Sequence, residues 1–126
     1  SYEKRLVKLI DRHVSDLKER WDDLYLVRNE KDLKLYAFKD GSPFMPDYLL
    51  FLEKHSENTK TYYVFIEPKG EHLEAGELWK QDFLLQLKSD AKVEMLLGEE
   101  SDIKIIGLPF YQPVRETDFE EALFDI

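Results

Sequence analysis

Two carboxylates and one lysine flank two apolar segments of this chain. Asp47 directly precedes the first apolar run, and Glu67 and Lys69 directly follow the second. The two acids are 20 residues apart, enough for one strand, a turn and a return strand, so the three charged groups can meet at one end of a sheet. Paired carboxylates beside an ammonium group suit metal-assisted hydrolysis of a phosphodiester.

A phosphodiester is an anion that water must attack and that must release an alkoxide, and a divalent cation assists both steps. Mg²⁺ prefers oxygen ligands, including one or two carboxylates, so we expect Asp47 and Glu67 to hold Mg²⁺, with Mn²⁺ able to substitute. The backbone carbonyl of Pro68 is a further candidate ligand. Because side chains alternate along the expected strand Thr61–Glu67, Lys69 projects to the same side as Glu67 and can orient the attacking water.

The same residues have a plainer interpretation, since an acid followed two residues later by a lysine is common at the solvated end of a strand. Here the two neighbouring runs are apolar at every position, which is typical of strands buried on both faces. Charged groups that directly abut such strands favour a site over a surface ion pair.

An amphipathic helix is expected from Tyr2 to Arg20, because apolar residues recur at three- and four-residue steps at Leu6, Ile10, Val14, Leu17 and Trp21. Glu3 falls on this apolar stripe, so its carboxylate is expected to point inward. Two interpretations of Glu3 remain open. It is either a further acid of the site or an acid that complements the helix dipole in the first turn.

The remaining pattern predicts a mixed sheet in an α/β domain. Beside the two central strands, strands are expected near Leu24–Arg28, Leu33–Phe38 and Ile103–Leu108, and a helix from about Glu77 to Ser89. Because that helix separates two buried strands, the last strand should pair in parallel with Thr61–Glu67. In the acidic tail, Thr117 and Glu120 are spaced as a capping box, which predicts a short docking helix or a frayed end.

Three stretches of the sequence, PDYLLFLE, YYVFIEPKGEHL and ELWKQDFL, resemble the PD-(D/E)XK nuclease superfamily. More narrowly, the chain resembles the carboxy-terminal endonuclease domain of the large, helicase-like subunit of type III restriction enzymes, from Tyr2 to about Leu87. The resemblance implies a restriction-endonuclease-like fold, with a mixed central sheet flanked by helices. It also implies residue roles: metal ligation by Asp47 and Glu67, catalysis by Lys69, an accessory acid at Glu3, and substrate contacts by Lys80 or Gln81.

The resemblance further implies a larger parent enzyme, because family members carry a translocating helicase before this domain. No Walker-type Gly-Lys-Ser/Thr loop occurs in this chain. We therefore expect residues 1–126 to be a single domain, either excised from the carboxy terminus of a helicase–nuclease chain or a stand-alone relative. The implied partners are DNA, the helicase domain of the same parent chain, which would use ATP, and a methyltransferase subunit.

Length and composition fit one compact domain, since 126 residues with 43% hydrophobic side chains can bury a single core. No apolar stretch reaches the roughly 18 residues expected of a membrane span. The chain has no cysteine, which excludes disulfides, zinc–thiolate sites and a cysteine nucleophile, and its opening residues lead us to expect no signal peptide. The expected location is the cytoplasm.

The net charge of −9 argues against unaided DNA binding, because affinity for nucleic acids comes mainly from Lys and Arg beside phosphates. Two alternatives to a DNA endonuclease therefore stay open. The first is a catalytically silent module that uses its acidic tail to dock onto another protein. The second keeps the metal chemistry but acts on branched, single-stranded or RNA substrates.

Overall fold

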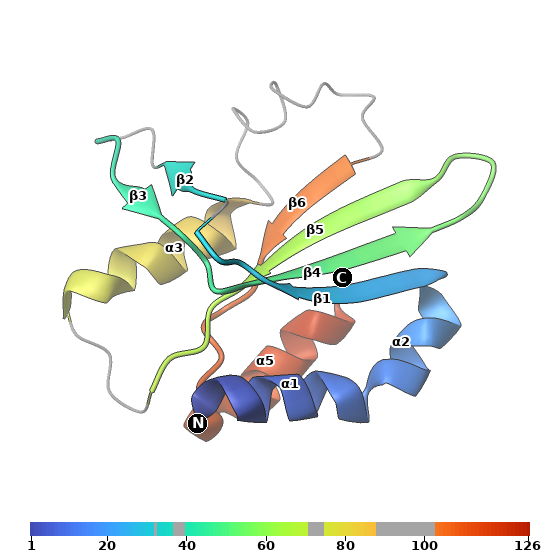
Figure 1. The fold of residues 1–126 in the computed structure, drawn as a ribbon, viewed down its shortest axis with the longest axis horizontal. Coiled ribbons are helices and arrows are strands. Elements are labelled where there is room, and N and C mark those ends of the chain that lie inside the picture. Colours follow the sequence, from blue (N-terminus) through green and yellow to red (C-terminus); the bar gives the residue numbers. More distant parts are fainter. Residues whose placement is uncertain (32, 37–39, 71–74, 88–102) are drawn as a thin grey trace.

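A four-stranded mixed sheet forms the centre of the protein, whose computed structural model describes residues 1–126 except 32, 37–39, 71–74 and 88–102 (Figure 1). The strands lie in the order β1 (Asp23–Arg28), β4 (Tyr48–Lys54), β5 (Lys60–Ile66) and β6 (Ile103–Gly107). β1, β4 and β5 pair antiparallel, whereas β5 and β6 pair in parallel. The predicted α/β class, the mixed sheet and the parallel pairing of the last strand are therefore confirmed.

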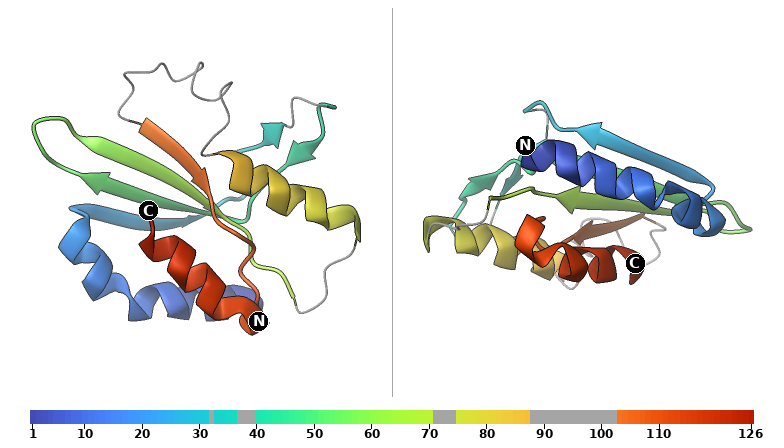
Figure 2. Two further views of the ribbon diagram at one scale, coloured as in Figure 1. Left: turned by 180° about the vertical axis from the view of Figure 1, so that it is seen from behind. Right: turned by 90° about the horizontal axis from the view of Figure 1, so that it is seen from below.

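One face of this sheet is covered by three helices, α1 (Tyr2–Arg12), α2 (Val14–Arg20) and α5 (Glu116–Phe124), which lie across it in Figures 1 and 2. Alternate side chains of the strands point towards these helices, as expected for a pleated strand. The larger of two core clusters forms here, with fully buried members that include Leu6, Leu9, Leu17, Leu50, Leu52, Val64, Ile66, Tyr111 and Phe119.

The other face is partly covered by α3 (Leu78–Gln86), which follows the short 3₁₀ helix η1 (Ala75–Glu77), and by a two-stranded sheet of β2 (Leu35–Tyr36) and β3 (Pro43–Phe44). A second cluster forms there, with Phe44, Phe65, Leu84, Leu87 and Phe110 buried. The loop after β6 leads through the 3₁₀ helix η3 (Pro113–Arg115) into α5.

The predicted single helix from Tyr2 to Arg20 is wrong in one respect, because it breaks at His13 into α1 and α2. The backbone N–H of His13 bonds to the carbonyl of Ile10, three residues back, instead of continuing the α-helical pattern. Its Nε2 lies 2.9 Å from Oε2 of Glu120, and its ring packs edge-on against Phe124. Contacts with α5 accompany a break that helical periodicity alone does not reveal.

Two further expectations need correction. The strand expected over Leu33–Phe38 is only Leu35–Tyr36 in the described residues, and it pairs with β3 outside the main sheet. The tail is a packed helix without the predicted capping box, because α5 begins at Glu116 and no side chain caps it.

The part of the expected Glu77–Ser89 helix beyond residue 87 lies outside the described residues. Within the described chain, no helix is long and apolar enough to cross a membrane.

Candidate active site

Asp47 and Glu67 meet where β4 begins and β5 ends, as the sequence predicts. Tyr48 and Ile66 are opposite each other in the antiparallel pair, so Asp47, just before Tyr48, and Glu67, just after Ile66, both lie next to the last paired residues. The backbone N–H of Asp47 donates a hydrogen bond to Oε1 of Glu67, with 3.1 Å between the two atoms. Two carboxylate-bearing residues are thereby held at one edge of the sheet.

Asn29, which sequence reasoning missed, fixes the approach of the chain to Asp47. Its backbone N–H donates to the carbonyl of Asp47 at 2.7 Å, and its side-chain amide donates to the carbonyls of Pro46 and Leu33, each at 2.9 Å. Asn29 also accepts a hydrogen bond from the N–H of Leu33. Asn29, the residue that follows β1, therefore joins the end of β1, the loop after it and the segment before β4.

Glu67 is a buried acid with only 5% of its surface exposed. Burial, the largest cause, and the neighbouring Asp47 together raise the pKa of Glu67 to about 8, against the opposing effect of the positive charge of Lys69. The raised pKa favours the protonated form of the Glu67 carboxyl group in the free protein. A cation that replaced this proton would compensate the buried negative charge.

Lys69 lies beside this pair because strand-like geometry continues beyond β5. Pro68 forms an isolated parallel bridge with Tyr111, in which Tyr111 N–H donates to the Glu67 carbonyl and Lys69 N–H donates to the Tyr111 carbonyl, at 2.9 and 2.8 Å. Pro68 is buried in this bridge, and metal ligation by its carbonyl stays a prediction. The Lys69 ammonium pairs with Oε1 of Glu77 at 3.0 Å, at the start of α3.

Glu3 does not point into the core as expected. Its side chain is 37% exposed, and its carboxylate pairs with the guanidinium of Arg28 at 2.6 Å. Arg28 lies over the ring of Tyr48 and is close enough to Asp47 to feel its charge, although Glu3 is the main cause of its raised pKa. The guanidinium of Arg28 therefore lies between Glu3 and Asp47 in this chain of charged groups.

Lys80 and Gln81, the expected substrate contacts, lie in the first turn of α3. The Lys80 ammonium is 5.6 Å from the ring centre of Phe44, and its charge helps to lower the pKa of Glu77 after the larger effects of Lys69. The side-chain oxygen of Gln81 accepts a hydrogen bond from the backbone N–H of Phe110 at 3.0 Å. Gln81 therefore ties α3 to the segment after β6, and its contact with a substrate stays a prediction.

An open cleft of about 360 Å³ runs beside Asp47, lined by Arg28, Asn29, Glu30, Lys31, Met45 and Asp47. Sequence reasoning missed both Arg28 and Glu77 as neighbours of the site. Arg28 ends the expected strand Leu24–Arg28. If that strand is paired antiparallel with the strand that follows Asp47, Arg28 falls opposite Tyr48 and beside the site. The position of Glu77 depends on how α3 returns to the sheet, which spacing does not determine.

Comparisons with known proteins place the chain in a family without stating an activity. The family model HI_1054_C, described as a C-terminal domain, matches residues 1–124. An uncharacterized protein of Haemophilus influenzae (strain ATCC 51907 / DSM 11121 / KW20 / Rd) is 37% identical over 119 residues, which cover 88% of this chain and 26% of that protein. The chain thus spans about a quarter of the length of this curated relative. No solved structure matches the chain. The chain belongs to the HI_1054_C C-terminal domain family.

Proposed function

We propose that this domain is a metal-dependent nuclease that hydrolyses DNA phosphodiester bonds, with a restriction-endonuclease-like fold of the PD-(D/E)XK type. The observation that carries the proposal is the buried Glu67 carboxyl group, joined to Asp47 and flanked by Lys69 at the end of two central strands. The resemblance of the sequence to the nuclease domain of type III restriction enzymes supports the same assignment.

The donor groups at this position fit a hard divalent cation. Asp47 and Glu67 supply carboxylate oxygens, and the unfavourable burial of Glu67 beside a second acid is a cost that Mg²⁺ or Mn²⁺ would relieve. In this proposal Asp47, Glu67 and the Pro68 carbonyl hold the ion. When bound, Mg²⁺ would acidify the attacking water and stabilise the leaving oxygen.

The other residues orient the substrate. Lys69 positions the nucleophile or neutralises charge on the phosphate, and its partner Glu77 limits where the flexible ammonium can lie. Glu3 serves as the accessory acid through Arg28, which borders the cleft beside Asp47 and can contact a phosphate. Lys80 and Gln81 of α3 approach the substrate from the side of Glu77. In the parent enzyme, an ATP-driven helicase domain and a methyltransferase subunit would deliver and select the DNA.

The test compares ion binding with nicking of supercoiled plasmid DNA in the same variants. Replacing Asp47 by Ala removes the carboxylate but keeps the backbone N–H that bonds to Glu67, so the fold should survive. We expect Asp47→Ala to lose the Mn²⁺ ion held at this site together with nicking, and Lys69→Ala to keep that ion while nicking falls about 100-fold or more. Calorimetric titration and a nicking assay measure the two effects.

Lys60→Ala is the matched control, because Lys60 is exposed and begins the same strand at its opposite end. It should bind Mn²⁺ and nick DNA as the wild type does. Unchanged Mn²⁺ binding in Asp47→Ala would contradict the metal site. Ion binding without nicking of plasmid, single-stranded, branched or RNA substrates would instead favour a catalytically silent module.

A further inference from the structure

A second group of ligand-type side chains lies at the far end of β4 from Asp47. Asp23 and Glu53 are opposite each other in the β1–β4 pair, and His55 follows Glu53 just after β4 ends. Glu53 lies near the end of β4, whereas Asp47 directly precedes its first residue, which separates the two groups by about 20 Å along the strand. The two groups are therefore distinct.

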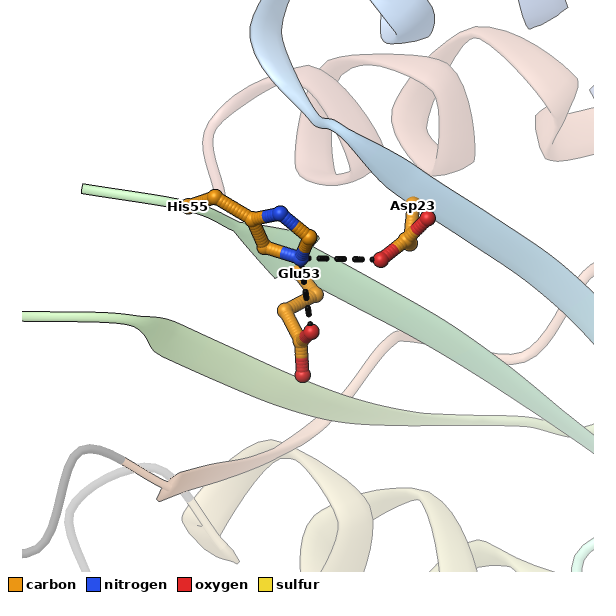
Figure 3. A group of neighbouring side chains, drawn as sticks. All are labelled: Asp23, Glu53 and His55. Atoms are coloured by element: carbon orange, nitrogen blue, oxygen red, sulfur yellow. Dashed lines mark hydrogen bonds and ion pairs between the residues drawn. The ribbon is translucent and has the colours of Figure 1, made fainter.

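Both carboxylates converge on one ring nitrogen. The Nε2 atom of His55 lies 2.9 Å from Oδ2 of Asp23 and 2.9 Å from Oε1 of Glu53, and the three atoms lie within 4.8 Å of one another (Figure 3). A single N–H can align well with only one of the two oxygens. The second carboxylate is then left with a poorly directed contact, and a cation at this point would satisfy all three groups.

The spacing suits a small dication. Zinc binds imidazole nitrogen and carboxylate oxygen at about 2.0–2.2 Å, so neighbouring ligand atoms in a tetrahedral site are about 3.3 Å apart. Small side-chain movements would bring the observed 2.9 Å separations to that value. An imidazole with two carboxylates favours zinc or a similar transition metal over Mg²⁺, which prefers oxygen ligands alone.

Neighbouring groups already hold two of these ligands in place. The second carboxylate oxygen of Glu53 accepts a hydrogen bond from the hydroxyl of Thr61 at 2.9 Å, and the backbone N–H of His55 donates to the carboxylate of Asp22. Such supporting contacts orient ligands and raise metal affinity. The side chains of Asp23 and His55 are 35% and 55% exposed, which leaves a path for the ion and a position for water.

We propose that Asp23, Glu53 and His55 form a Zn²⁺ site that fastens the edge strand β1 to β4. Asp23 comes from β1, whereas Glu53 and His55 come from β4 and the residue that follows its end, so a shared ion crosslinks the two strands. The site lies away from the proposed nuclease centre and does not depend on that function. Its expected role is structural, because an ion bound only by the folded chain stabilises it.

The test is calorimetric titration of ZnCl₂ into untagged, chelator-treated protein that carries Asp47→Ala, so that the other carboxylate pair does not compete. We expect one ion per chain and an increased melting temperature. Adding His55→Gln or Asp23→Asn should weaken Zn²⁺ binding about tenfold or more. Titration with Co²⁺ should give visible absorption bands that are absent in the His55→Gln protein.

His13→Gln is the matched control, since the Nε2 of His13 is also 2.9 Å from a carboxylate, and among the described residues Glu120 is its one acidic partner. This variant should bind Zn²⁺ unchanged. Equal Zn²⁺ binding before and after His55→Gln, or an equal loss with His13→Gln, would overturn the proposal. Because Asp47 is already replaced in every sample, neither result bears on the nuclease proposal.

Discussion

At the residue scale, Glu67 is the most unusual ionisable group that the structure describes. Its carboxyl group is buried, and it accepts the amide of Asp47 in place of water. Burial and the neighbouring Asp47 both destabilise the ionised form of Glu67, which is why the pKa of Glu67 rises to about 8. Strongly shifted pKa values are concentrated at functional sites, where a proton or a cation is exchanged.

This raised pKa predicts how stability depends on pH in metal-free protein. Between the ordinary value of 4.5 and about 8, the folded chain keeps the Glu67 proton while the unfolded chain releases it. The folded state therefore binds more protons, and the free energy of unfolding contributed by this group falls as pH rises, by at most about 1.4 kcal/mol per pH unit. Glu67→Gln should remove this fall, as urea unfolding at several pH values in the presence of a chelator would measure.

Glu121→Gln is the control for that experiment, because Glu121 is an exposed acid on α5. Its stability should follow the same pH dependence as the wild type. If the wild type and Glu67→Gln change in parallel with pH, then Glu67 does not titrate in this window.

The sequence predicted the meeting of Asp47 and Glu67 because both abut strands that had to pair as neighbours. It did not predict the partners of the cations. Glu77 reaches Lys69 from the start of α3, and Arg28 reaches Glu3 from the end of β1. These pairs join segments whose relative positions depend on packing, which residue spacing does not encode.

At the element scale, the contact between α3 and β6 depends on one glycine. A Cβ atom built on Gly107 would lie 2.2 Å from the backbone oxygen of Leu84 and 2.6 Å from its Cα. Backbone atoms cannot move aside as a flexible side chain does, so a larger residue must push α3 away from the sheet. Gly107 therefore sets the position of the helix that carries Lys80 and Gln81 and that directly follows Glu77.

Gly107→Ala should consequently destabilise the protein by about 1–3 kcal/mol, the usual range for overpacking a well-filled interface. Chemical unfolding monitored by circular dichroism measures this change. Gly76→Ala is the matched control, since a Cβ there would meet no described atom within 4 Å, and it should leave stability unchanged or raise it by up to about 1 kcal/mol. Equal stabilities of the two variants would show that α3 is not closely packed at Gly107.

The elements themselves were predictable where one pattern dominated. The two central strands and the parallel β6 followed from continuous apolar runs and from the crossover helix between them. The break at His13 and the start of α5 were not predictable, because each involves contacts between distant segments. Glu116, for example, is the first residue of α5 and pairs with Arg12 at the end of α1.

At the scale of the whole molecule, the acidic tail belongs to the fold. Phe119 and Leu123 of α5 are buried in the main core. Glu116 contacts Arg12 at the end of α1, and Glu120 contacts His13, the residue that follows α1. Charge reversal at these two acids would therefore disturb folding as well as any partner. A test of the docking alternative should use the exposed acids of this helix and its end, Asp118, Glu121 and Asp125.

The overall charge of −9 predicts a distinctive response of the proposed nuclease to salt. Two cations near the site, Lys69 and Arg28, are already paired with acids, so the isolated domain should neutralise few DNA phosphates. Because each phosphate contact contributes about 0.9 to the slope of log affinity against log salt, we expect a slope shallower than about −2. Single-turnover nicking of a short duplex, at fixed free Mg²⁺ and increasing NaCl, measures this slope.

Lys80→Gln should flatten the salt dependence by about 1 if Lys80 contacts a phosphate, whereas Lys60→Gln, at an exposed position, should not alter it. A slope near −5 would instead indicate a basic DNA-binding surface, and the domain would then not need its parent enzyme to hold DNA.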